Sequence, residues 1–148
     1  MLHPIDIQPD KALSAYLTGN VFVGEGTART AVPVYSDWER PTNKLPDDFV
    51  VVYINGSLEG VGMDTPFAKG NIIMSLYCKM NDDGSVKDKR VKKILRQFDL
   101  LIDKKLTGGY YFEYEAQQFI TPTTPNQTTG YSVTSLNLRW TTTSELNQ

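Results

Sequence analysis

The sequence predicts an α+β fold: a single mixed or antiparallel sheet of four or more strands, with a long amphipathic helix and a short N-terminal helix packed on one face. Two patterns carry this prediction. Several short segments alternate hydrophobic and polar residues, which is typical of strands with one buried face. One longer segment repeats its hydrophobic residues every three or four positions, as an amphipathic helix does. The 148 residues suit one domain, 1–148, whose tail, 142–148, we expect to fray.

The N-terminal part is expected to hold the short helix and then short strands. Leu13 and Leu17 are four residues apart, which places them on one side of a helix running from Asp10 to Leu17. Residues 21–38 are rich in valine and aromatic residues but interrupted by glycine and proline, which predicts short strands. Residues 39–48 are polar and contain two prolines, which predicts a loop.

Four segments are predicted to form the main sheet: Phe49–Ile54, Ile72–Met80, Tyr110–Glu115 and Tyr131–Trp140. The first is apolar on both alternating faces, which is typical of a central strand covered on both sides. The other three alternate along their length. Residues 55–71 contain four glycines and predict a long loop or a loose hairpin. Residues 120–130 are rich in threonine and proline and predict a polar loop.

The long helix is predicted from Val86 to Leu106. Ser85 or Asp83 is expected to cap its start, and Gly108 is expected to provide a left-handed turn at its end. The hydrophobic positions follow steps of three and four and therefore form one stripe. The stripe consists of Val91, Ile94, Leu95, Phe98, Leu101, Ile102 and Leu106. It should cover the sheet face formed by Ile72, Met74 and Leu76.

The outer face of this helix is the main candidate functional surface. Residues 86–105 contain eight lysines or arginines and three aspartates, so their net charge is +5, and the rest of the chain carries −7. Lys89, Lys93 and Arg96 fall together opposite the hydrophobic stripe. Leu100 falls among them, where a solvated helix would carry a polar residue. A leucine surrounded by cations on an outward face indicates a contact surface.

Two kinds of partner fit that surface. A basic helix can neutralise phosphates, so residues 86–105 could serve a small nucleic-acid-binding accessory domain. The aromatic residues do not alternate with these cations, however, and the chain outside the helix is acidic. We therefore favour a protein partner and do not expect direct contact with nucleic acid.

The sequence shows no pattern typical of a catalytic, cofactor or metal site. The NDDG turn does not fit a calcium loop, because with Gly84 in sixth place the first and twelfth positions are Lys79 and Arg90. No glycine-rich phosphate loop is present. Glu113 and Glu115 share a strand face, which is more typical of a solvated surface than of a metal site. We expect no enzymatic activity, no cofactor and no bound metal.

Individual residues and segments argue against histidine-based catalysis, an internal disulfide and a membrane partner. His3 is the only histidine and lies near the start, so histidine-based catalysis has no centre. Cys78 is the only cysteine, which excludes an internal disulfide. The N-terminus does not have the pattern of a signal peptide, and no apolar stretch is long enough for a membrane span, so we expect no membrane partner.

The order of elements resembles that of the tail terminator proteins of long-tailed bacteriophages. The segments that carry the resemblance are FVVVYINGS, NIIMSLYCKMNDDG, VKKILRQFDLLI, GGYYFEYE and GYSVTSLNLRW. They lie within residues 49–141, and the likeness is one of pattern rather than of a specific motif. The segment before residue 49 matches less clearly, which leaves open another head–tail joining or neck protein of similar size.

The resemblance implies a structural virion protein rather than an enzyme. In that family a small subunit forms a ring, expected to be a hexamer, that caps the last ring of tail-tube protein and joins it to the head completion or connector protein. The implied location is the head–tail interface of the virion, after assembly in the host cytoplasm. Loops and outward helix faces make the contacts in that family. The resemblance thus adds residues 58–69 and 121–129 as contact segments, and with them Met63, Phe67, Pro122 and Pro125.

Overall fold

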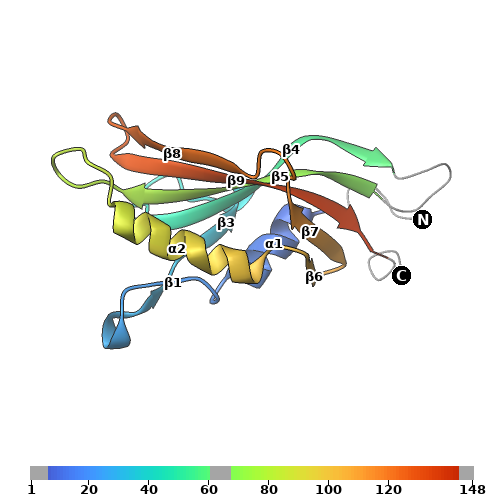
Figure 1. The fold of residues 1–148 in the computed structure, drawn as a ribbon, viewed down its shortest axis with the longest axis horizontal. Coiled ribbons are helices and arrows are strands. Elements are labelled where there is room, and N and C mark those ends of the chain that lie inside the picture. The colour runs from blue at the N-terminus through green and yellow to red at the C-terminus, as the bar shows by residue number, and fades with distance from the viewer. Residues whose placement is uncertain (1–6, 61–67, 144–148) are drawn as a thin grey trace.

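The fold is mostly β, as the computed structural model shows for residues 7–60 and 68–143 (Figure 1). Strands make up 44% of the structure and helices 23%, and the main sheet curls into a half-barrel. The predicted α+β class, one sheet with a long helix on it, is therefore wrong. The elements in chain order are α1 (Pro9–Leu17), β1 (Phe22–Val23), the 3₁₀ turn η2 (Gly26–Ala28), β2 (Thr30–Ala31), β3 (Val34–Ser36), the 3₁₀ turn η3 (Asp37–Glu39), β4 (Asp48–Gly60), β5 (Ala68–Lys79), α2 (Asp88–Leu101), β6 (Lys105–Thr107), β7 (Tyr110–Tyr114), β8 (Ile120–Asn126) and β9 (Tyr131–Thr142).

The main sheet has seven strands in the order β3-β4-β5-β9-β7-β6, and β8 also pairs with β9. Strands β3 and β4 are parallel, and all other pairs in this sheet are antiparallel. Strand β9 is the central strand of this arrangement. One edge of β9 pairs with β5. On its other edge, the N-terminal half of β9 pairs with β8 and the C-terminal half pairs with β7. The four strands predicted for the main sheet correspond to β4, β5, β7 and β9.

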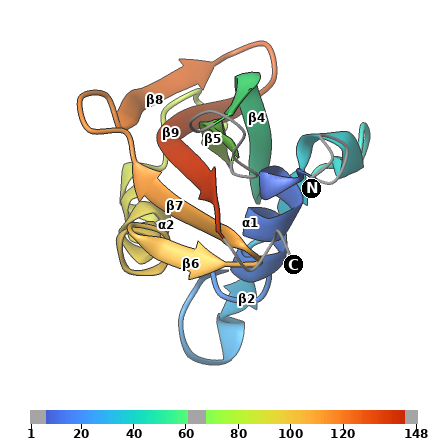
Figure 2. The ribbon, with the colours of Figure 1, turned by 90° about the vertical axis from the view of Figure 1, so that its right-hand side faces the viewer.

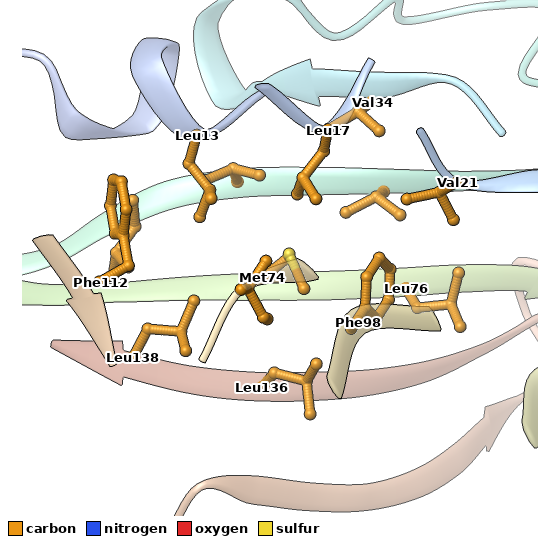
Figure 3. Close-up of a cluster of buried hydrophobic side chains, with 14 of the residues drawn as sticks. Leu13, Leu17, Val21, Val34, Met74, Leu76, Phe98, Phe112, Leu136 and Leu138 are labelled. Carbon is orange, nitrogen blue, oxygen red and sulfur yellow. The ribbon is translucent and has the colours of Figure 1, made fainter. Parts of the chain in front are cut away.

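The hydrophobic core lies between the two α-helices and one face of the sheet. Leu13 and Leu17 of α1 are fully buried there, as the N-terminal pattern predicted. Figure 3 shows side chains from α1, α2, β5, β7 and β9 pointing toward one another. In β5, the buried positions Ile72, Met74 and Leu76 face the helices, which confirms the predicted alternation.

The opposite face of the sheet has a smaller aromatic cluster. Phe49 is 1% exposed, although it points away from the main core. Its ring stacks on Tyr77 with the centroids 4.7 Å apart, and Tyr131 meets its edge at 5.5 Å. The Tyr131 hydroxyl donates a hydrogen bond to the Pro46 carbonyl, which holds the residue 39–48 loop against this face. These contacts explain why the start of β4 is apolar on both faces.

Helix α2 is shorter than predicted at its C-terminal end. It ends at Leu101, and residues 105–107 form strand β6 instead. Gly108 and Gly109 have φ values of 58° and 86°, so they form a two-residue hairpin turn that joins β6 to β7 rather than a helix cap. Leu106 consequently lies on β6, where it is 64% exposed instead of buried in the stripe.

The predicted N-terminal cap of α2 is also wrong. The residue before the helix is Lys87, and it makes no side-chain cap. Ser85 and Asp83 bind each other instead, with the Ser85 backbone N–H donating to Asp83 Oδ1 at 2.9 Å. These hydrogen bonds from Ser85 lower the pKa of Asp83. They hold a tight strand-to-helix turn, in which Gly84 has a φ of 83°.

One flank of α2 is held by polar contacts with the sheet and with β1. The Arg90 guanidinium forms a bidentate ion pair with Asp48, whose carboxylate is 5% exposed. Gln97 bonds the backbone of Phe22 in both directions, accepting its N–H at 2.8 Å and donating to its carbonyl at 2.6 Å. These contacts fix the rotation of the helix and therefore decide which face is turned outward.

Residues 120–126 form a strand, which corrects the predicted loop. Strand β8 contains Pro122 and Pro125, yet it pairs with the first half of β9. Proline is tolerated there because an edge strand has a partner on only one side. The glycine-rich segment 55–71 is largely the arms of the β4–β5 hairpin, and its residues 61–67 lie outside the described part of the chain.

Candidate functional site

The outward face of α2 presents the four residues that its sequence pattern singled out. Lys89, Lys93 and Arg96 are exposed, and Leu100 is 91% exposed. The helix turns them outward because Ile94 and Phe98, at the centre of the opposite stripe, are completely buried. The structure therefore brings these predicted residues together on one surface.

The cations of this surface differ in their partners. Lys93 Nζ lies 3.0 Å from Glu25 Oε1, and Lys92 Nζ lies 2.9 Å from Asp88 Oδ2. Within the described parts of the chain, Lys89 and Arg96 lie in no ion pair. Two positive charges thus remain for a partner, and one of them, Arg96, lies one helical turn before the exposed Leu100.

A groove lies beside this face, between α2 and the start of β8. Its volume is about 190 Å³. Its lining residues are Lys92, Leu95, Arg96, Asp99, Tyr114, Phe119, Ile120 and Leu136. We call it the α2–β8 groove. Pockets for small-molecule ligands usually measure about 300–1,000 Å³. This groove is therefore better suited to a single large side chain than to a free ligand.

The α2–β8 groove has an apolar wall and a fixed polar end. Phe119 is 49% exposed and Ile120 is 38% exposed, so the wall is open to solvent. The Tyr114 ring packs against Phe119 with centroids 5.7 Å apart, and its hydroxyl donates to Asp99 Oδ1 at 2.9 Å. Burial raises the pKa of Tyr114, and the hydrogen bond to Asp99 adds to the shift. The phenol therefore stays neutral and keeps the groove in shape.

A second exposed hydrophobic feature lies in η3, which we call the Trp38 turn (Asp37–Glu39). Trp38 is 92% exposed, the highest value among the large hydrophobic side chains of the described residues. Asp37 and Glu39 flank it. Their ion pairs with Arg40 and Lys11 are long, at 3.8 Å each. This exposed tryptophan was not among the predicted contact residues. A tryptophan between two acids, next to a polar proline-containing segment, was the available signal.

The loop residues implied by the family resemblance have different placements. Pro122 and Pro125 are exposed on β8, the strand whose first residue, Ile120, lines the α2–β8 groove. Met63 and Phe67 lie outside the described residues.

Other candidate chemical groups are engaged in structural contacts. Glu113 and Glu115 both face Arg139, with oxygen–nitrogen distances of 3.1 and 3.8 Å. Cys78 is buried, and burial, with the neighbouring Asp48 carboxylate, raises the pKa of its thiol to about 12. The described residues contain no group of three or more histidine, cysteine, aspartate or glutamate side chains placed to hold a metal ion. In that same part of the chain, neither α-helix is long and apolar enough to cross a bilayer.

Comparison with known proteins gives a likeness of fold. No protein-family model matches the chain, and no curated protein matches it. Solved structures do match, including one that superposes with a TM-score of 0.59 over 96% of this chain and 96% of its own. Its sequence is 14% identical, and its name carries no functional description. This likeness therefore concerns the fold alone.

Proposed function

We propose that the protein is a structural virion subunit that assembles as a ring at the head–tail joint of a long-tailed bacteriophage. In this role it is a tail terminator: the ring, expected to be a hexamer, caps the tail tube and joins it to the head completion or connector protein. The mechanism is burial of complementary surfaces rather than a chemical reaction. Its place is the head–tail interface of the virion, after assembly in the host cytoplasm.

The observation that carries the proposal is the exposed hydrophobic surface on α2. Leu100 is 91% exposed on a helix whose rotation is fixed by Arg90 and Gln97, so it cannot turn inward to escape water. The α2–β8 groove lies next to it with further open apolar side chains. Exposed hydrophobic side chains gathered beside unpaired cations are typical of surfaces that another protein covers.

The experiment is a mass measurement of the purified protein, alone and with the tail-tube subunit of the same virus. A terminator should form a ring on tube ends and stop further addition of tube subunits, which electron microscopy of tube lengths would detect. Tubes that grow to the same lengths with and without the protein would contradict the proposal. A ring that instead binds only the connector would favour another head–tail joining protein.

Nucleic-acid binding is the competing function, because Lys89 and Arg96 lie in no ion pair among the described residues. It requires phosphate contacts and a steep dependence of affinity on salt. We expect little DNA affinity at physiological salt, since the chain outside residues 86–105 carries −7. A filter-binding or anisotropy titration across salt concentrations separates the two functions.

A further inference from the structure

We infer that the Trp38 turn of one copy of this chain docks in the α2–β8 groove of a second copy. The inference rests on the proposed ring function, which needs a contact repeated from subunit to subunit, and it names the two surfaces that make that contact. The partner is thus this chain itself, and the interface is head-to-tail.

The apolar parts of the two surfaces match in kind and size. Trp38 projects from a short 3₁₀ turn with 92% of its surface exposed. The α2–β8 groove offers Leu95, Phe119 and Ile120 as an open wall, with a volume of about 190 Å³. Tryptophan is among the residues that most often dominate an interface when they fill a pocket. One exposed tryptophan and one groove for a single large side chain therefore form a natural pair.

The charges around the two surfaces are also complementary. Asp37 and Glu39 flank Trp38, and their side chains are 51% and 62% exposed, with only long ion pairs to hold them. Two cations and one acid line the groove: Lys92, Arg96 and Asp99. Lys92 also pairs with Asp88, whereas Arg96 lies in no ion pair among the described residues and is the cation free to meet the acids of the Trp38 turn. Opposite charges around an apolar anchor favour encounter in one orientation and disfavour wrong partners. The acids beside Trp38 also oppose a nucleic acid as the occupant.

The placement of the two surfaces makes the contact head-to-tail. In Figure 2 the segment between β3 and β4, which contains the Trp38 turn, lies on the right-hand side, whereas α2 and β8 lie on the left. The turn therefore cannot reach the groove of its own chain. A contact between two different surfaces on opposite sides repeats from copy to copy and closes into a ring when the rotation permits.

The test uses one variant for each surface. Trp38→Ser removes the anchor, and Ile120→Lys places a bulky cation in the groove. Leu106→Ser is the matched control, because Leu106 is 64% exposed on β6, outside both surfaces. We expect each surface variant to raise the dissociation constant for self-association at least about 30-fold, as expected for a hot-spot residue. The control should leave it within about twofold of the wild type.

Mixing the two variants distinguishes this contact from any other. Each Trp38→Ser subunit keeps an intact groove, and each Ile120→Lys subunit keeps an intact anchor. An equimolar mixture should therefore form one-to-one dimers that cannot extend, measured by native mass spectrometry with one variant isotopically labelled. Full-size assemblies from the mixture, or no dimers in it, would overturn the inference.

A charge-reversal experiment tests the polar part without removing the anchor. Reversal of Asp37 and Glu39 to lysine should weaken self-association, and so should reversal of Lys92 and Arg96 to glutamate. A chain that carries all four substitutions should regain self-association, because the new lysines beside Trp38 then face the new glutamates beside the groove of the next copy. Circular dichroism and thermal melting establish that every variant is folded before its association is measured.

The outcomes separate this inference from the proposed function. Wild-type protein that stays monomeric at every soluble concentration and on tail tubes would overturn both. Ring formation on tubes that Trp38→Ser leaves intact would overturn the inference and keep the proposed function. If Ile120→Lys abolishes tube binding but leaves self-association unchanged, the tube protein occupies the groove. That result would again overturn the inference alone. Head-to-tail association without tube capping would keep the contact and reject the terminator function.

Discussion

Leu100 and Phe98 are two residues apart on α2, yet their environments are opposite. Leu100 is 91% exposed, and Phe98 is completely buried. We expect Leu100→Asp to impair assembly while changing the free energy of unfolding by well under the roughly 2–5 kcal/mol of a buried leucine truncation. Phe98→Ala is the control and should cost about 3–5 kcal/mol. Urea denaturation and sedimentation measure the two effects. Equal losses of stability and assembly in Leu100→Asp would show that Leu100 belongs to the core.

Cys78 gives a prediction about pH. Burial raises the pKa of its thiol to about 12 in the folded protein, above its ordinary 9.0. The folded state therefore keeps the proton that the unfolded state releases, so this contribution to stability is complete below pH 9 and is lost as the pH rises toward 12. We expect Cys78 to react with a thiol reagent at pH 8 only at the rate of unfolding. Fast labelling of the native protein, measured spectrophotometrically, would contradict this.

The ion pair between Arg90 and the buried Asp48 carboxylate helps to attach α2 to the sheet. Arg90→Ala leaves the Asp48 carboxylate buried without its partner. We expect a loss of about 1–3 kcal/mol in the free energy of unfolding, below the cost of a fully buried pair because the Arg90 side chain is 39% exposed. The matched control is Lys92→Ala, whose pair with Asp88 is exposed and should contribute at most about 0.5 kcal/mol. Similar losses in the free energy of unfolding for both variants would show that the Arg90–Asp48 pair contributes no more than an exposed ion pair.

Elements with a strong internal pattern were predictable, and elements defined by their neighbours were not. Helix α2, around Ile94, and strands β5 and β9 each bury one side against the core. Their hydrophobic residues therefore recur with the period of a helix or a strand, which the sequence alone reveals. Strand β6 has three residues and no apolar pattern of its own, and it exists because the Gly108–Gly109 turn pairs it with β7. The α2–β8 groove needs residues 92–99 and 114–136 to meet, which no local pattern encodes.

At the scale of the whole molecule, charge is unevenly distributed, with +5 in residues 86–105 and −7 elsewhere. We expect removal of charge at Lys89, Lys93 and Arg96 to disturb ring or connector assembly, because the cations lose contacts with acidic surfaces of neighbouring subunits. If nucleic acid were the partner, each lost phosphate contact would flatten the salt slope by about one unit. Tight, salt-steep DNA binding by the wild type, with assembly unchanged in the variant, would reject the terminator function.

Strand β8 also affects the tendency of this protein to aggregate at high local concentration. An exposed strand edge can recruit the same edge of another copy and grow into a cross-β fibre. Pro122 and Pro125 interrupt the row of donors on β8, and proline side chains oppose such growth. We expect a Pro122→Val, Pro125→Val variant to form thioflavin-positive aggregates at concentrations where the wild type stays in solution. Subunits that must gather at one end of a tail can thus associate through side chains while their sheets remain separate.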